Sequence, residues 1–313
     1  MPRFRYVQIK CVTIMTAQNI LGYRNIVAAV AIHVTGHPAV ARAANIAKKI
    51  QCGVTLVHAM GGDPSPETSG IPQDTNSDAA IEIRELMREL QLTHPDANQI
   101  KLLTGHWSAI VDVADEIGAD LIVIGSYVHG QLETLLGETS DQVLHHAKSD
   151  VLVVHSDLYD ENHPPRDYKR IVATTDLSGR GYGAVRRAAR MTDTFGAELI
   201  LLNTIEHFPT DRENERITPE NQDPMDYQCN LRRQDLKDLA NSLELADVQL
   251  EVIVANQTAK RSIPEYAKAK QADLIVIGAR DHYGLDVLLG NTADGIIHHT
   301  PCDVLVVHET VDA

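Results

Sequence analysis

Histidines and cysteines are the residues of this chain with the widest chemical range. The sequence contains 15 histidines, and four of them form adjacent pairs, His145 with His146 and His298 with His299. Adjacent side chains on a helix point about 100° apart, so such a pair does not hold one ion as an i, i+4 pair does. We interpret all four as helix-end residues that interact with the C-terminal helix dipole, and we predict no metal site.

The four cysteines are Cys11, Cys52, Cys229 and Cys302, and they lie at wide intervals without a C-x-x-C motif. This spacing fits neither a disulfide framework nor a zinc knuckle. We therefore predict a protein of a reducing compartment, with a cytoplasmic location.

Motifs of hydrolytic catalysis are absent from the sequence, which contains no G-x-S-x-G, no H-E-x-x-H and no G-x-x-x-x-G-K-[ST]. Ser178 lies two residues after Asp176, but closeness along the chain does not make a nucleophile. We predict no catalytic residues and a protein that is not an enzyme.

The charge and composition of the chain indicate which classes of partner it does not bind. The formal net charge of −15 opposes binding to nucleic acid, and the single tryptophan, Trp107, offers little for base stacking. Arg186, Arg187 and Arg190 form a basic helix face, which we interpret as solvated. The sequence has no apolar run of 18 residues, so we also expect no membrane partner.

An internal repeat positions these residues. The segments 119–155 and 272–308 are identical at 22 of 37 positions with an offset of 153 residues, and earlier in the repeat the offset is 145. The second copy therefore holds eight extra residues, which we place in the polar stretch 206–223.

Strand and helix patterns alternate within each copy. In the second copy, apolar or β-branched runs at 171–175, 199–203, 249–254, 274–277 and 304–307 alternate with helical patterns. This alternation predicts βαβ units and a parallel sheet, hence two doubly wound α/β domains. Ligands of such sheets bind outside the carboxyl ends of the strands.

The domain organisation follows from the repeat. We predict a leader at 1–24 without a counterpart in the repeat and without order. The first domain then covers 25–157, a polar linker with a Pro-Pro pair covers 158–168, and the second domain covers 169–310.

Three phrases, IVATTDLSG, ADLIVIGARD and LLGNTADGIIHHTPCDVLVVH, resemble the universal stress protein family in its tandem form. The resemblance covers residues 25–310. It implies two Rossmann-like domains, similar to adenine nucleotide alpha hydrolases, with five-stranded parallel sheets. It also implies pairing of the last strands into an intramolecular pseudo-dimer, which could pair again as a homodimer.

The resemblance further implies a site for ATP. In ATP-binding members an aspartate after the first strand contacts adenine, and a glycine pattern, G-x2-G-x9-G-[ST], lets the backbone approach the phosphates. In the second copy Asp176, Gly278 and Gly290 match. Asp281 replaces the middle glycine, the following spacer has eight residues, and Asn291 replaces the serine or threonine. The predicted nucleotide-binding residues are Thr175, Asp176, Gly278, Arg280, Asp281, His282, Gly284, Gly290, Asn291 and Thr292.

The first copy departs further from the pattern, with Ala31 at the aspartate position, Val128 at the middle glycine and Glu138 directly after Gly137. A carboxylate near a phosphate costs up to about 4 kcal/mol at an effective dielectric constant near 20. We therefore predict no nucleotide in the first domain.

The favoured hypothesis is a stress-response protein whose second domain binds or senses ATP, with Mg²⁺ offsetting Asp281. One alternative is an interaction scaffold that binds no nucleotide. The other is a slow ATPase that uses Asp281.

Overall fold

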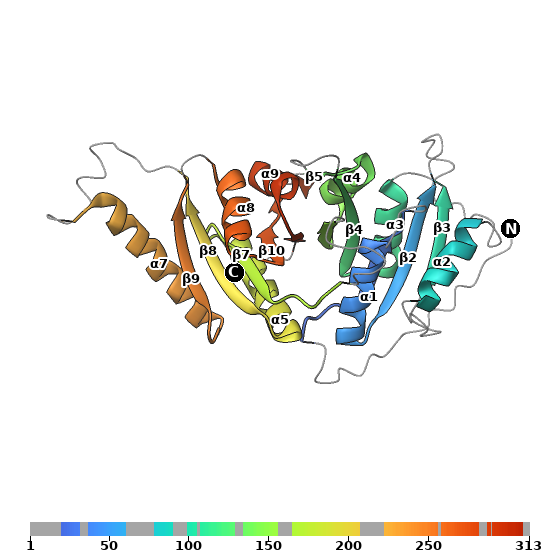
Figure 1. The fold of residues 1–313 in the computed structure, drawn as a ribbon, viewed down its shortest axis with the longest axis horizontal. Coiled ribbons are helices and arrows are strands. Elements are labelled where there is room, and N and C mark those ends of the chain that lie inside the picture. Colours follow the sequence, from blue (N-terminus) through green and yellow to red (C-terminus); the bar gives the residue numbers. More distant parts are fainter. Residues whose placement is uncertain are drawn as a thin grey trace.

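A computed structural model of the chain (Figure 1) describes residues 20–31, 37–60, 78–89, 99–104, 107–128, 134–155, 165–206, 222–255, 258–281, 287–288 and 290–308. Strands and helices alternate along both halves, as the repeat predicts. We refer to the half from β1 to β6 as domain 1 and to the half from β7 to β13 as domain 2.

Domain 1 consists of six strands and four helices within its described residues. They are β1 (Asn25–Ala29), α1 (Pro38–Ile50), β2 (Gly53–Met60), α2 (Asp78–Glu89), β3 (Gln99–Thr104), α3 (Trp107–Ile117), β4 (Leu121–Val128), β5 (Thr134–Leu135), α4 (Glu138–His146) and β6 (Asp150–His155).

Domain 2 repeats this order with small changes in element length. Its elements are β7 (Arg170–Thr174), α5 (Gly179–Phe195), β8 (Glu198–Ile205), α7 (Pro224–Ser242), β9 (Gln249–Val254), α8 (Ala259–Ala269), β10 (Leu274–Gly278), β11 (Arg280–Asp281), β12 (Val287–Leu288), α9 (Asn291–His299) and β13 (Asp303–Val307). Most of the stretch 206–223, where we expect the extra residues, lies outside the described residues.

The two domains share one sheet, with the strand order β3-β2-β1-β4-β6-β13-β10-β7-β8-β9. Each domain contributes five mutually parallel strands, as expected. The domains join through antiparallel pairing of their last strands, with Leu305 opposite Leu152. The predicted pseudo-dimer is therefore confirmed as a fold.

Helices cover both faces of this sheet, so alternate residues of a strand enter different cores. Ile26 and Ala28 of β1 pack into the cluster under α1, α2, α5 and α7, whereas Val27 packs into the cluster under α3, α4, α8 and α9. Each cluster contains residues of both domains. The near-continuous apolar strands of the sequence are therefore explained by a sheet that is buried on both faces.

The predicted leader is wrong for its last residues. Leu21 and Tyr23 are fully buried in the core, although the sequence assigned them to a segment without order. Their counterparts in domain 2 are Arg166 and Tyr168, at the end of the predicted linker, and Tyr168 is buried as well. Both segments are held because each tyrosine donates to a buried aspartate of its own domain and lies under an arginine of the other domain, as described below. Residues 1–19 lie outside the described residues.

Among the described residues, none of the helices has the length and apolar character needed to cross a membrane. Cys52, Cys229 and Cys302 are free thiols, and Cys11 lies outside the described residues. Burial raises the pKa of the Cys302 thiol to about 12, so this thiol stays protonated at neutral pH.

Candidate functional site

A cavity of about 300 Å³ lies in domain 2 at the carboxyl ends of β7, β8 and β10. The strand order reverses between β7 and β10, and ligands of doubly wound sheets bind at such a switch point. We call this cavity the domain 2 pocket. Its described lining consists of Thr174, Thr175, Asp176, Ser178, Gly181, Leu202, Thr204, Glu206, Ala259, Ile263, Ile277, Gly278, Ala279, Gly290, Asn291, Thr292, Ala293 and Ile296.

The floor of the pocket is a hydrogen-bonded pair of strand ends. The Thr175 amide donates to the Leu202 carbonyl at 3.0 Å, and the buried Asn203 Nδ2 donates to the Thr175 carbonyl at 2.8 Å. Asn203 Oδ1 and Thr204 Oγ1 are buried without a hydrogen-bond partner within the described part of the chain. Of these two residues Thr204 lines the pocket, so its hydroxyl favours a polar ligand or water there, because a buried polar atom is costly to leave unpaired.

Asp176 forms the rim of the pocket with its side chain exposed. Its Oδ1 accepts hydrogen bonds from the Ser178 amide at 2.9 Å and from Ser178 Oγ at 2.5 Å. Ser178 in turn caps α5, because its hydroxyl accepts from the Gly181 amide at 3.4 Å. The turn therefore fixes the aspartate through one oxygen. The other oxygen, Oδ2, makes no hydrogen bond to a described residue.

Gly181 is a residue of the pocket that the sequence analysis missed. A Cβ atom at this position would lie 2.2 Å from Thr175 Oγ1 and 3.0 Å from Asp176 Oδ1. Only glycine lets the first turn of α5 approach the end of β7 this closely. The signal was the run SGRGYG at the start of the predicted helix.

The N-terminus of α9 lies across the pocket from Asp176. Gly290 is its N-cap, and no side chain caps the helix there. The first amides of a helix have no partner within it and favour an anion. Asn291 and Thr292 occupy this first turn and line the pocket.

The charge of the described lining is negative. It holds the carboxylates of Asp176 and Glu206 and no lysine or arginine. Glu206, which sequence reasoning also missed, caps α8 by accepting from the Ala259 amide at 2.6 Å. A polyanionic ligand would therefore depend on the α9 amides or on a cation bound with it.

The structure brings six of the ten predicted residues to one cavity: Thr175, Asp176, Gly278, Gly290, Asn291 and Thr292. The backbones of Arg280 and Asp281 form β11, which pairs with β12 in a short antiparallel hairpin. His282 and Gly284 lie outside the described residues.

Domain 1 has a cavity of about 380 Å³ at the equivalent place, which we call the domain 1 pocket. Ala31 lines it at the position of Asp176, and Glu138 lines it at the first position of α4. His58 occupies the position equivalent to Asn203. Its Nδ1 lies 2.8 Å from the carbonyl oxygen of Val30, as Asn203 Nδ2 lies 2.8 Å from that of Thr175. The backbone of Val128 ends β4 and pairs with Thr134.

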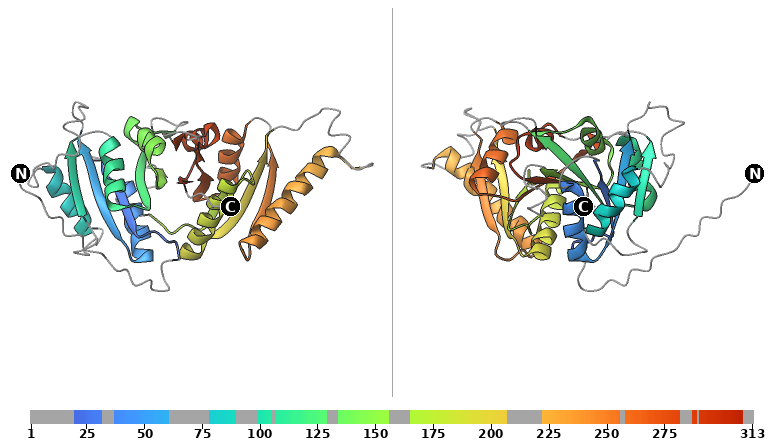
Figure 2. Two further views of the ribbon diagram at one scale, coloured as in Figure 1. Left: turned by 180° about the vertical axis from the view of Figure 1, so that it is seen from behind. Right: turned by 45° about the vertical axis from the view of Figure 1, so that its right-hand side comes forward.

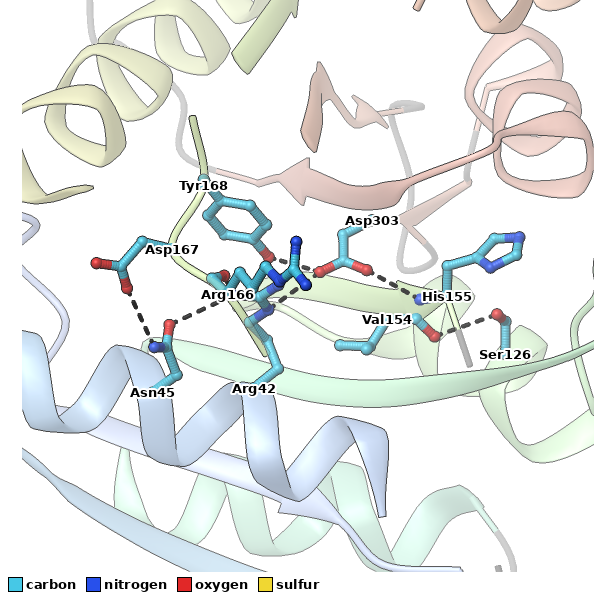
Figure 3. Close-up of polar contacts among 9 residues, drawn as sticks. All are labelled: Arg42, Asn45, Ser126, Val154, His155, Arg166, Asp167, Tyr168 and Asp303. Atoms are coloured by element: carbon cyan, nitrogen blue, oxygen red, sulfur yellow. Dashed lines mark hydrogen bonds and ion pairs between the residues drawn. The ribbon is translucent and has the colours of Figure 1, made fainter. Parts of the chain in front are cut away.

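The junction between the domains is held by a buried ion pair with a tyrosine (Figure 3). Arg42 of α1 lies 3.1 Å from Asp303 of β13, measured from Nε to Oδ2, and both side chains are almost fully buried. Tyr168 donates to the same oxygen at 2.7 Å, and the Arg42 guanidinium lies over the tyrosine ring. The other carboxylate oxygen accepts from the His155 amide at 3.0 Å.

The same arrangement recurs with the domains exchanged. Arg187 of α5 lies 2.9 Å from Asp150 of β6, and Tyr23 donates to Asp150 at 2.7 Å. The guanidinium lies over the Tyr23 ring, and the His308 amide donates to Asp150 Oδ1 at 2.9 Å. The interpretation of Arg187 as part of a solvated face is therefore wrong, because this side chain is buried in the junction.

Comparisons with known proteins agree with this architecture. The Universal stress protein family matches residues 22–155 and again 167–308. Universal stress protein A homolog 1 of Coxiella burnetii is 33% identical over 140 residues, which cover 45% of this chain and 96% of that protein. The crystal structure of a universal stress protein from Archaeoglobus fulgidus matches 92% of this chain and 97% of that chain, with 18% identity and a TM-score of 0.62.

Two further solved relatives are complexes with adenine nucleotides. A universal stress protein in complex with cAMP is 24% identical over 46% of this chain and 98% of that chain. One from Archaeoglobus fulgidus in complex with dAMP is 17% identical over 45% of this chain and 99% of that chain. Both have a TM-score of 0.32.

Proposed function

The chain belongs to the universal stress protein family in a tandem form, and from this premise we propose that domain 2 binds ATP as its magnesium complex while domain 1 completes the pseudo-dimer as a scaffold. The observation that carries the proposal is the pairing, across one pocket, of the exposed Asp176 carboxylate with the uncapped N-terminus of α9. These groups suit the two ends of a nucleotide, a base or ribose that donates hydrogen bonds and a phosphate that accepts them.

The floor of the pocket supports a polar ligand. The buried Thr204 hydroxyl oxygen lines the pocket and has no partner among the described residues, so a ligand hydroxyl or amino group would satisfy it. Gly278 and Gly290 carry no side chain into the cavity, which leaves the backbone of β10 and of the α9 cap open to phosphate oxygens.

The negative lining explains why we propose the magnesium complex. Asp176 and Glu206 would repel free phosphate groups, and the described lining holds no basic side chain to offset them. Mg²⁺ binds carboxylate and phosphate oxygens together and removes this repulsion. The ion would supply charge neutralisation only.

We propose binding without hydrolysis. Both described carboxylates of the pocket are engaged in structural hydrogen bonds, Asp176 with Ser178 and Glu206 with the Ala259 amide. The described lining also contains no histidine, cysteine or lysine that could act as a base or nucleophile. The protein would act as a nucleotide-dependent member of a stress response.

The test is a calorimetric titration of the full chain with magnesium ATP. We expect one site per chain, and at least tenfold weaker binding by Asp176→Ala. Asp176→Asn keeps an acceptor for Ser178 and loses the charge, so it separates the ligand contact from the turn. Asp193→Ala removes an exposed aspartate at the other end of α5 and is the matched control.

Absence of heat with the unaltered protein, or equal affinity of the Asp176→Ala variant, would overturn the proposal. The lack of basic residues in the described lining favours, in that case, an interaction scaffold without a nucleotide. ADP release that falls in Asp281→Ala would instead establish a slow ATPase.

A further inference from the structure

Two helices from different domains meet at the junction, and each carries an aspartate and a histidine four residues apart. α4 contributes Asp141 and His145, and α9 contributes Asp294 and His298. Figures 1 and 2 show α4 and α9 next to each other where the domains join. The duplicated sequence thus places the same pair of residue types on both sides of the pseudo-twofold axis.

The distances within this group suit a metal ion. His145 Nε2 lies 3.6 Å from Asp141 Oδ1, and His298 Nε2 lies 3.5 Å from Asp294 Oδ1. One ligand atom each of Asp141, Asp294 and His298 lies within 4.8 Å of the other two. Two side chains of domain 2 and one of domain 1 therefore converge on one point, and all three are half-buried.

The convergence of Asp141 and Asp294 is unfavourable without a positive charge. Both are carboxylates from different domains, and like charges at this separation repel each other. The β6–β13 pairing sets the relative position of the two helices that carry these carboxylates. A cation between them would turn this repulsion into attraction.

We propose that Asp141, Asp294 and His298 bind a zinc ion, with His145 as the fourth ligand. Zinc takes four nitrogen, oxygen or sulfur ligands in a tetrahedron, with bonds of about 2.0–2.1 Å to histidine nitrogen, which places neighbouring ligand atoms about 3.4 Å apart. The two aspartate–histidine separations already have this value within 0.2 Å. Side-chain rotation must bring His145 to the other ligand atoms, because the group within 4.8 Å consists of Asp141, Asp294 and His298.

The neighbouring histidines do not belong to this group. His146 Nδ1 and His299 Nδ1 each lie 2.8 Å from the carbonyl oxygen four residues earlier, of Gln142 and Gly295. The His146 ring also stacks on Trp107, with ring centroids 4.1 Å apart. Each adjacent pair therefore divides into one histidine that faces the junction and one that is held by its own helix. His299 provides a matched control on the same turn as His298.

The experiment is a calorimetric titration of the chelator-treated full chain with zinc chloride in the absence of nucleotide, so that failure of the zinc site and failure of the ATP site are distinguishable. We expect saturation at one zinc per chain. Asp294→Asn and His298→Gln should weaken binding at least tenfold, and His299→Gln should leave it unchanged. No saturable binding, or equal loss in His299→Gln, would overturn the proposal.

Asp141→Asn tests whether the ion is shared between domains. It should weaken zinc binding as much as Asp294→Asn does, because a single ion contacts both. Unchanged affinity in Asp141→Asn would overturn the interdomain site. All substituted positions are partly exposed, so the metal-free variants should fold, which far-ultraviolet circular dichroism checks. In the unaltered protein, zinc should raise the melting temperature reversibly, and the absence of such a rise would also count against the site.

Discussion

Domain 1 and domain 2 share their junction and differ at their pockets. At the junction both domains contribute the same three residue types, with Arg42, Tyr168 and Asp303 on one side and Arg187, Tyr23 and Asp150 on the other. At the pockets, Ala31 of domain 1 occupies the position equivalent to Asp176 of domain 2, and Glu138 occupies the position equivalent to Asn291. The duplicated chain therefore keeps identical chemistry where each copy must fit the other, and its copies differ where each could meet a ligand.

The two pockets occupy equivalent places in the fold and differ in the side chains that line them. Both cavities lie at equivalent strand ends, and in both a polar side chain contacts the carbonyl of the residue directly after the first strand, His58 in one domain and Asn203 in the other. The same fold therefore accommodates different pocket side chains in its two domains. Substitutions in the pockets can test ligand binding, and substitutions at the junction can test stability.

The largest effect is expected from breaking the symmetry of the junction. Asp303→Ala should lower the free energy of unfolding by about 3–5 kcal/mol, because it leaves the Arg42 guanidinium buried without its counterion. Asp150→Ala should cost the same, since Arg187 is held in the same way. Urea unfolding monitored by circular dichroism measures both.

Asp115→Ala is the control for the junction, because its ion pair with Lys148 is exposed and should contribute less than about 1 kcal/mol. Losses for Asp303→Ala and Asp150→Ala that differ by more than about 1 kcal/mol would show that the two halves are not energetically equivalent.

The next effect concerns the shape of the domain 2 pocket. Gly181→Ala should destabilise the protein by about 1–3 kcal/mol, because the new methyl group overlaps Thr175 Oγ1. It should also weaken ATP binding, since Thr175 and Asp176 must move. Gly179→Ala, two residues earlier in the same helix, meets no atom within 4 Å and should leave stability unchanged or raise it. Equal melting temperatures for the two variants would contradict the close approach.

Replacing a rim residue of domain 2 with its domain 1 counterpart should change ATP binding and stability in opposite directions. Asn291→Glu places a carboxylate in the first turn of α9, where it should stabilise the helix by about 0.3–1 kcal/mol. The same carboxylate should repel phosphate and weaken ATP binding at least tenfold, or about 1.4 kcal/mol. Calorimetry and thermal unfolding measure the two effects.

The reciprocal variant, Glu138→Asn, should lower stability slightly and leave ATP affinity unchanged, because domain 1 is not the proposed site. A change of affinity in Glu138→Asn as large as in Asn291→Glu would move the proposed nucleotide site to the domain 1 pocket.

The smallest effect is expected at the exposed edge of the junction. Burial raises the pKa of Asp167, but hydrogen bonds from Lys49 and Asn45 and the charges of Lys49 and Arg42 outweigh it, so the net pKa lies below its usual value. The stabilisation is therefore present above the unfolded-state pKa of about 3.9 and is lost as the pH falls through the lower folded-state value.

Asp167→Asn should accordingly cost less than about 1 kcal/mol at neutral pH, because the Asp167 carboxylate and Lys49 are both partly exposed to solvent. The difference from the unaltered protein should disappear in acid, as urea unfolding at several pH values would measure. A difference that grows on acidification would contradict the sign of this pKa shift.

The sequence by itself determined the repeat, the order of strands and helices, and the family. Periodicity and a constant offset are properties of the chain, and β9 (Gln249–Val254) matches its predicted span without change. Asp176, Gly278 and Gly290 were also predictable, because they match the aspartate and glycine pattern of the family that the sequence resembles.

Only the tertiary structure decided which side chains meet. Arg42 and Asp303 are 261 residues apart and pair because antiparallel β6 and β13 bring α1 to the other domain. The close approach of Gly181 to Thr175 and the convergence of Asp141 with Asp294 likewise depend on distances between elements. Sequence spacing encodes which face of an element a residue occupies, whereas packing decides what that face contacts.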